Sequence, residues 1–179
     1  MKLFTTLILT AILFTGCGYT NPYAVSDADG TDERVPLYLE MWKDNANQMG
    51  YQNVIQQSLV HWLKKSKSFV LVRDRQDADH ILSGIIHSVD YPGLSYGTYD
   101  RAIELRAKVQ FSYTLEEKEN NTVKLKKKNF TKLQSFMVGT SAVGTNDNKE
   151  LALREIAEEL AEEIYIELSY LLIPKKEGA

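Results

Sequence analysis

A strictly alternating segment in the second half of the chain constrains the fold more than any other feature. From Ile103 to Glu116, apolar side chains occupy every odd position and polar or charged side chains occupy every even position. Successive side chains of a β-strand point to opposite faces, so this period of two predicts a long strand with one buried and one solvated face. Such a strand requires a sheet, and the sheet requires a second layer to cover its apolar side.

Two segments with helical spacing can supply that second layer. Between Gly50 and Ser66, one helical face is apolar, with Tyr51, Ile55, Leu59, Trp62 and Leu63. Near the end of the chain, apolar residues recur at spacings of three and four and stop before Pro174, at Leu153, Ile156, Leu160, Ile164, Leu168 and Leu171. Asp147 and Glu150 offer a capping box, which predicts that this last helix begins there.

Shorter patterns predict the remaining strands. They cover residues 35–39, 69–72, 81–89 and 123–138, and Asn120-Asn121 supplies the turn between the two long strands. The last strand is less regular than its partner, which leaves room for a bulge. We therefore predict an α+β fold, a two-layer sandwich in which two helices cover one face of a four- to five-stranded mixed sheet.

The N-terminus has the pattern of an export signal. Lys2 is followed by a mostly apolar run from Leu3 to Phe14, and Thr15-Gly16 then precedes Cys17, the only cysteine of the chain. The run is too short to span a hydrocarbon core, which needs about 20 apolar residues. It resembles a bacterial lipobox, in which the cysteine becomes the acylated first residue of the mature protein. The alternatives are an uncleaved anchor and an ordinary cleaved signal.

Lipidation of Cys17 predicts how the chain is organised. Residues 1–16 would be a lipoprotein signal peptide, 17–34 a flexible tether, 35–174 a single folded domain and 175–179 a disordered tail. Two or three acyl chains hold a protein on a membrane almost permanently. Because Gly18 rather than Asp follows the cysteine, the bacterial sorting rule favours the periplasmic side of an outer membrane.

Little in the sequence points to catalysis. His61, His80 and His87 lack metal-ligand spacing, and no motif presents an activated nucleophile. The glutamates of the last helix, Glu155, Glu158, Glu159, Glu162 and Glu163, are expected to form a solvated face, with a basic partner as the alternative. A net charge of −3 gives no indication of nucleic-acid binding. We predict a protein that is not an enzyme and has no cofactor and no metal.

The segment from Asp90 to Asp100 is too long and too aromatic for a simple hairpin turn. It carries Tyr91, Leu94, Tyr96 and Tyr99. Aromatic residues are enriched at the centres of protein interfaces, so we expect these four to contact a partner. The alternative is that they fold back over the edge of the sheet.

Basic residues gather on the predicted outer face of the hairpin. Lys124, Lys126, Lys128 and Lys132 share one parity on the second long strand, and Arg106 and Lys108 lie on the solvated parity of the first. A basic sheet face suits phosphate-bearing ligands or an acidic partner. The alternative is that these lysines only protect an edge strand from aggregation.

The order of these segments resembles a known family. Gly16-Cys17-Gly18-Tyr19, Val35-Pro36-Leu37, the helix around Asn53 to Leu63 and the segment from Asp77 to Gly84 come in the order found in LptE-type lipopolysaccharide-assembly lipoproteins. The long amphipathic strand follows them, while Tyr38-Leu39-Glu40-Met41 departs from the Phe-x-Asn that often follows the Val-Pro segment in that family.

The resemblance implies a function without catalysis. Such proteins are anchored in the outer membrane, plug the β-barrel translocon LptD and help it deliver lipopolysaccharide to the outer leaflet. We therefore expect Tyr91, Leu94, Tyr96 and Tyr99 to meet the barrel. We expect Arg106, Lys108, Lys126 and Lys128 to meet lipopolysaccharide phosphates or barrel carboxylates. The alternative is a tethered periplasmic binding or scaffold lipoprotein of another envelope transport complex.

Overall fold

A computed structural model describes residues 34–173, and Cys17 with its leader lies outside the described residues. The two long helices are α2 (Tyr51–Lys65) and α3 (Ala142–Leu172), and two short 3₁₀ turns are η1 (Arg75–Asp77) and η2 (Thr98–Asp100). The strands are β1 (Val35–Leu39), β2 (Lys43–Asp44), β3 (Phe69–Leu71), β4 (His80–Asp90), β5 (Gly93–Tyr96), β6 (Ala102–Glu117) and β7 (Thr122–Met137).

These strands form one mixed sheet of seven strands. Its order is β3-β1-β4-β6-β7, with β1 parallel to both β3 and β4, and with β6 antiparallel to β4 and β7. β1 and β2 pair with successive parts of the same edge of β4. In the same way, β4 and β5 pair with successive parts of the same edge of β6. The prediction of four to five strands missed β2 and β5, because a two-residue strand and a strand flanked by Pro92 and Gly97 carry no alternating pattern.

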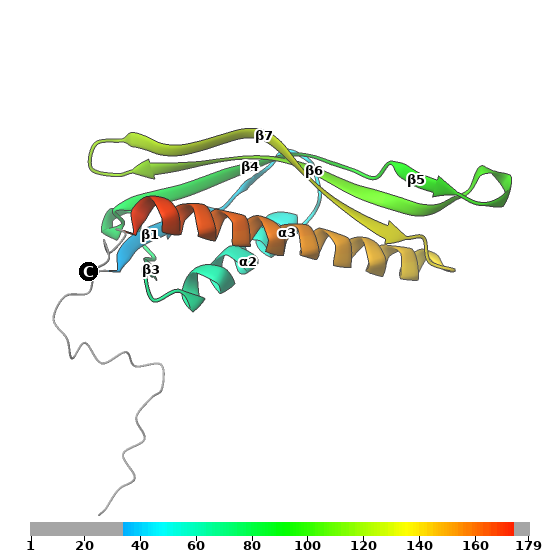
Figure 1. Cartoon of the computed structure of the whole chain (residues 1–179), viewed down its shortest axis with the longest axis horizontal. Helices are drawn as coiled ribbons and strands as arrows, with labels where there is room; N and C mark the ends of the chain where they lie inside the picture. The colour runs from blue at the N-terminus through cyan, green and yellow to red at the C-terminus, as the bar shows by residue number, and fades with distance from the viewer. Residues whose placement is uncertain (1–33, 174–179) are drawn as a thin grey trace, which may run out of the picture. The chain divides into compact units, whose positions relative to one another are not determined.

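The predicted two-layer α+β architecture is confirmed. Figure 1 shows α2 and α3 together on one side of the sheet. The alternation of β6 sets the core, because its odd positions from Ala107 to Leu115 are all buried against the helices. Trp42 joins this core from the β2 side, with its ring centroid 6.0 Å from that of Phe111 and 6.5 Å from that of Tyr113.

The last helix begins earlier than its capping box predicted. α3 starts at Ala142, where Ser141 is the N-cap and its Oγ accepts a hydrogen bond from the Gly144 amide at 3.1 Å. Asp147 and Glu150 therefore lie inside the helix. A serine N-cap satisfies one of the free amides of the first turn, and Thr145 adds a second link by accepting from the Gly139 amide at 3.0 Å.

A bulge in β7 decides which lysines face the helices. Phe111 is opposite Phe130, but Tyr113 is opposite Lys127, so Lys128 and Asn129 together oppose a single residue of β6. Asn129 adopts a left-handed conformation with φ of 50°. The extra residue reverses the side-chain parity of the strand beyond it. The expectation that Lys132 shares the outer face with Lys126 is therefore wrong.

The inward lysines pair with the glutamates of α3. Lys132 lies 2.9 Å from Glu159 and 2.6 Å from Glu163, and Lys127 lies 2.5 Å from Glu167 and also contacts Glu163. On the opposite flank of α3, Glu158 accepts hydrogen bonds from Ser58 of α2 at 2.7 Å and from the Trp62 indole at 3.2 Å. The predicted solvated face holds for Glu155, Glu159 and Glu162, which are exposed, whereas Glu158 and Glu163 are half-buried. The basic partners of Glu159 and Glu163 belong to β7 of the same domain.

These ion pairs shift the ionisation of their members. Burial alone would raise the pKa of Glu163, but hydrogen bonds from Lys127 and Lys132 outweigh it and lower the pKa from its usual 4.5. Burial alone would lower the pKa of Lys132, but its hydrogen bonds to Glu163 and Glu159 raise the pKa above its usual 10.5. Burial, together with a hydrogen bond to Glu167, raises the pKa of the Tyr113 hydroxyl.

Replacing Lys132 should give a pH-dependent loss of stability. Because the pKa of Glu163 is lowered on folding, its pairing stabilises the protein above about pH 4.5 and is lost as the pH falls through the folded value. The raised pKa of Lys132 means that its contribution is lost as the pH rises past 10.5. At pH 7, we expect Lys132→Met to lower the free energy of unfolding by about 1–3 kcal/mol.

Urea denaturation at acid and neutral pH measures this effect. The difference between wild type and Lys132→Met should shrink at pH values well below the usual pKa of Glu163. Lys64→Met on the exposed side of α2 is the control and should change stability little at either pH. A difference that stays constant with pH would contradict the proposed role of the ion pair.

The Trp42 ring packs directly against the backbone of Gly84, which makes Gly84 sensitive to substitution. A Cβ atom at this position of β4 would lie 2.3 Å from the ring carbons Cδ2 and Cε2 of Trp42, a side chain that is only 2% exposed. The ring has no room to retreat, so Gly84→Ala should destabilise the protein by about 1–3 kcal/mol. Thermal denaturation followed by circular dichroism checks this, with Ser83→Ala as the neighbouring control.

Candidate partner and lipid contact surfaces

The segment from Asp90 to Asp100 is the end of a long hairpin and not a loose loop. β5 pairs with the first residues of β6, and the Arg106 amide donates to the Pro92 carbonyl at 3.0 Å. The turn is closed by a hydrogen bond from the Gly97 amide to the Arg101 carbonyl at 2.8 Å. β6 therefore carries this turn well beyond the part of the strand that α2 and α3 cover, as Figure 1 shows.

The turn holds two consecutive residues in a left-handed conformation. The φ angle is 64° at Tyr99 and 52° at Asp100. This region disfavours residues that carry a Cβ, and a tyrosine there is strained. The Tyr99 side chain is nevertheless 91% exposed, so no packing inside the domain repays the strain. Strain combined with an exposed aromatic ring is typical of contact sites.

Of the four predicted contact residues, the structure separates Tyr91 from the others. The Tyr91 ring packs against Phe136 with a centroid distance of 6.1 Å, and its hydroxyl donates to Gln48 Oε1 at 2.9 Å. Burial raises the pKa of this hydroxyl to about 12. Leu94, Tyr96 and Tyr99 remain exposed at the turn. Tyr91 thus fixes the base of the hairpin to the domain, while the other three are available to a partner.

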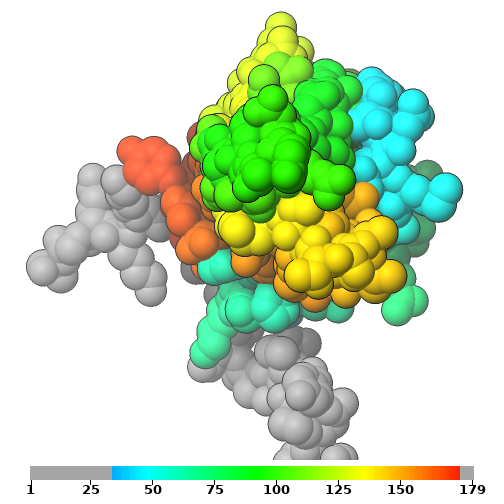
Figure 2. Space-filling model, turned by 90° about the vertical axis from the view of Figure 1, so that its right-hand side faces the viewer, coloured from blue at the N-terminus to red at the C-terminus, as the bar shows by residue number. Residues whose placement is uncertain are grey.

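Three further exposed apolar residues lie at the same end of the domain, with Ile103 and Met137 on opposite faces of the sheet. They are Ile103 at the start of β6, Met137 at the end of β7 and Val143 in the first turn of α3, and they are 44%, 57% and 71% exposed. In Figure 2 the green surface of the hairpin lies directly beside the yellow surface where β7 ends and α3 begins. We call the set the apolar tip, which comprises Leu94, Tyr96, Tyr99, Ile103, Met137 and Val143.

Sequence reasoning missed these additional members for a physical reason. Ile103 continues the apolar parity of β6, so its pattern alone predicts burial, but the strand extends beyond the helices that would cover it. Met137 lies within the short apolar run Phe136-Met137-Val138, and Val143 lies between Ala142 and Gly144 before the apolar stripe of the last helix begins, so neither carries a periodic signal. The only sequence hint was an apolar residue on each side of the Gly139-Thr140-Ser141 loop.

The predicted basic residues form two groups on the outer face of the sheet. Arg106 and Lys108 neighbour each other on β6, and Lys126 is opposite Thr114 further along the same strand. Lys108 and Thr114 are six residues apart, which corresponds to about 20 Å along a strand. Lys128, in the bulge opposite Ser112, lies between Lys126 and the first group. Lys108, Lys126 and Lys128 are exposed and Arg106 is half-buried.

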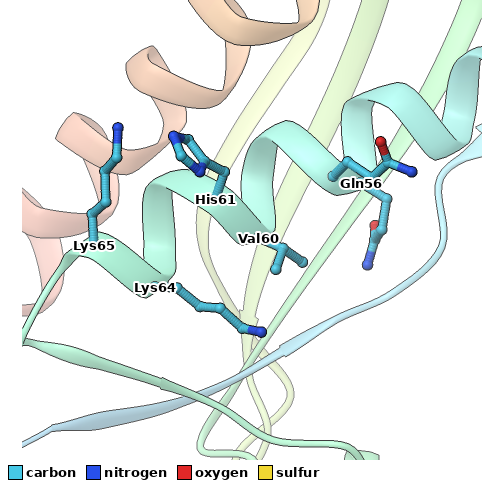
Figure 3. A pocket seen from close by; sticks show the side chains of 6 residues that line it. Gln56, Val60, His61, Lys64 and Lys65 are labelled. Carbon is cyan, nitrogen blue, oxygen red and sulfur yellow. The ribbon is translucent and has the colours of Figure 1, made fainter. Parts of the chain in front are cut away.

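A shallow open groove of about 450 Å³ runs over the exposed side of α2. It is lined by Gln56, Gln57, Val60, His61, Lys64 and Lys65, five of which Figure 3 labels. His87 of β4 forms a hydrogen bond with Ser112 Oγ of β6 at 2.7 Å, and it does not line this groove. Within residues 34–173, no group of histidine, cysteine, aspartate and glutamate side chains is arranged to hold a metal ion.

The match to a protein-family model decides the family. The model for LptE, described as lipopolysaccharide-assembly, matches residues 35–168, from the start of β1 almost to the end of α3. The chain belongs to the LptE family. Among curated protein sequences, none matches it. The sequence-based assignment to LptE-type lipoproteins is therefore confirmed.

Solved structures support the fold of this LptE-family protein. A protein from Xanthomonas campestris is 15% identical with a TM-score of 0.54, and the match covers 76% of this chain and 86% of that one. Uncharacterized lipoprotein B from Nitrosomonas europaea is 12% identical with a TM-score of 0.53, covering 78% and 87%. Rare lipoprotein B from Shewanella oneidensis is 14% identical with a TM-score of 0.50, covering 75% and 94%.

At such low identity, these likenesses concern the fold alone. In this LptE-family chain no helix of residues 34–173 combines the length and the hydropathy needed to cross a bilayer. The predicted lipid anchor, Cys17, lies outside the described residues, so its lipidation stays a prediction. In the described domain, the apolar tip and Lys108, Lys126 and Lys128 of the outer sheet face are exposed to solvent.

Proposed function

We propose that this LptE-family protein is a non-catalytic outer-membrane lipoprotein that plugs the β-barrel translocon LptD and helps it assemble, so that the barrel delivers lipopolysaccharide to the outer leaflet. The observation that carries the proposal is the apolar tip at the end of the long hairpin. Six exposed large apolar side chains at one end of a small domain are an interaction site rather than an ordinary solvated surface.

The position of the apolar tip fits a plug. The described chain enters at Val35, beside the end of the sheet where β6 finishes at Glu117, because Leu37 and Glu117 both pair with His80. The tip lies at the other end of β6, and 16 residues of strand span about 50 Å. A domain tethered at the first end would therefore present its tip away from the tether, deep in a lumen.

Recovery of the barrel from membranes tests this function. The tagged full-length protein should co-purify LptD in stoichiometric amount. Tyr96→Ser combined with Tyr99→Ser should lower the recovered barrel by about tenfold, since buried aromatic anchors dominate interface energies. Both side chains are exposed in the domain, so its melting temperature should stay unchanged.

A matched control uses two exposed apolar residues elsewhere. Leu151→Ser combined with Ile166→Ser removes comparable apolar surface from α3. This control should recover the barrel as the wild type does. Full recovery by the tip variant, equal loss in the control, or capture of a different envelope transporter in place of a barrel would each contradict the proposal.

We further propose that the outer sheet face contacts the phosphates of lipopolysaccharide. Lys126→Glu with Lys128→Glu should weaken binding of purified lipopolysaccharide, and Arg106→Glu with Lys108→Glu reports on the other group. Each pair should contribute to the binding free energy by an amount that decreases as the salt concentration rises. Fluorescence titration measures the affinity, with circular dichroism as a check on folding. If both variants bind as the wild type does, this assignment fails.

A further inference from the structure

The chain enters the domain beside the C-terminal end of α2. β1 runs parallel to β3, with Val35 opposite Phe69, and the Val35 amide donates to the Ser68 carbonyl at 2.8 Å. Whatever precedes Val35 therefore joins the fold next to the short connection from Lys65 to Phe69. This end of the domain is opposite the apolar tip, as Figure 1 shows by the positions of β1, β3 and β5.

Three lysines surround this entry point. Lys64, Lys65 and Lys67 are exposed, and within residues 34–173 none of them forms an ion pair with an acidic side chain. The Lys65 ammonium lies 5.3 Å from the ring centroid of Trp62. Figure 3 shows Lys64 and Lys65 on different sides of the helix, so the positive charge spreads over the whole end of α2.

Apolar side chains continue this surface onto α3. The solvent side of that helix carries acidic residues as far as Glu162, but after it come Ile166, Tyr170 and Leu171, which are 56%, 73% and 44% exposed. Tyr165 connects the two helix ends, since its ring centroid lies 5.8 Å from that of Trp62 and 6.3 Å from that of Phe69.

The charge of the exposed residues is mixed in the sheet layer and basic at the end of α2. Acidic residues occur in the sheet layer, in η1 and in the turn between β6 and β7, where arginines and lysines accompany them. Within residues 34–173, the end of α2 and the connection after it carry lysines without an ion pair, and the end of α3 carries tyrosine and aliphatic side chains. Aromatic residues and lysines at the boundary of an apolar surface are the composition of membrane-interface segments.

We propose that this tether-end surface, made of Lys64, Lys65, Lys67, Ile166, Tyr170 and Leu171, docks on the anionic phospholipid head groups of the bilayer that holds the lipid anchor. The lysines bind lipid phosphates, and the apolar side chains enter the interface between head groups and acyl chains. The docking rests on the proposed function only through the anchor at Cys17. From that residue, the stretch 18–34 reaches at most about 60 Å even when fully extended, which keeps Val35 near the bilayer.

Vesicle flotation tests the surface without the anchor. The probe is the mature chain, residues 17–179, with Cys17→Ser, which retains the compact unit 33–179 and every core residue. It should float with vesicles of phosphatidylcholine and phosphatidylglycerol and only weakly with phosphatidylcholine alone. Replacing Lys64, Lys65 and Lys67 with Gln should lower binding to the anionic vesicles by about tenfold or more. Ile166→Ser with Leu171→Ser should lower it by about fivefold.

Two controls match these changes. Replacing Lys43, Arg101 and Arg154 with Gln removes the same charge from exposed positions elsewhere, and Leu151→Ser with Leu133→Ser removes similar apolar surface. Both controls should float like the unsubstituted chain. The proposal is overturned if the lysine variant or the apolar variant of the helix ends floats as well as the unsubstituted chain, or if either control loses as much binding.

The outcome is separable from that of the proposed function. The variant with Lys64, Lys65 and Lys67 replaced by Gln, made in the full-length protein, should still co-purify the barrel, because the apolar tip is intact. If the wild type fails to co-purify the barrel but the probe binds anionic vesicles, the plug is rejected and the docking surface stands. If the wild type co-purifies the barrel but the probe does not bind vesicles, the docking surface is rejected and the plug stands.

Discussion

The packing of the odd face of β6 against α2 and α3 is the interaction on which the rest of the structure depends. β6 pairs with β4, β5 and β7, and its pairings with β4 and β7 are the longest of the sheet. Its inner side chains from Ala107 to Leu115 are fully buried between sheet and helices. Because that face is buried, the even side chains of β6 point to the outer surface, which places the basic residues there. Because β6 is longer than the part that the helices cover, its first residues are exposed and form part of the apolar tip.

The bulge in β7 then distributes the positive charge. Without it, Lys132 would share the outer face with Lys126, and of these lysines only Lys127 would face the glutamates of α3. With it, Lys127 and Lys132 neutralise the carboxylates of Glu159, Glu163 and Glu167, while Lys126 remains outside. Part of the row of like charges on α3 is therefore matched by lysines of the neighbouring strand.

The domain consequently differs between its two ends. One end carries exposed aromatic and aliphatic side chains on a turn with strained backbone, and the other carries lysines, tyrosine and aliphatic residues where the chain enters. This division fits the proposed role, in which one end of the domain meets a bilayer surface and the other enters a barrel. At identities of 12–15%, the solved structures that share this fold retain few of its residues, so the common property is the layer arrangement.

The sequence by itself determined the elements whose signal is local. The alternation from Ile103 to Glu116, the apolar stripe of each helix and the stop before Pro174 predicted the class of fold, because each pattern reflects one element facing one core. The order of these segments also indicated the LptE family. Only the tertiary structure decided the parity of Lys132, the burial of Tyr91 against Phe136 and the exposure of Ile103. Those properties depend on strand register and on where a covering helix ends, and both are set by contacts between residues far apart in the chain.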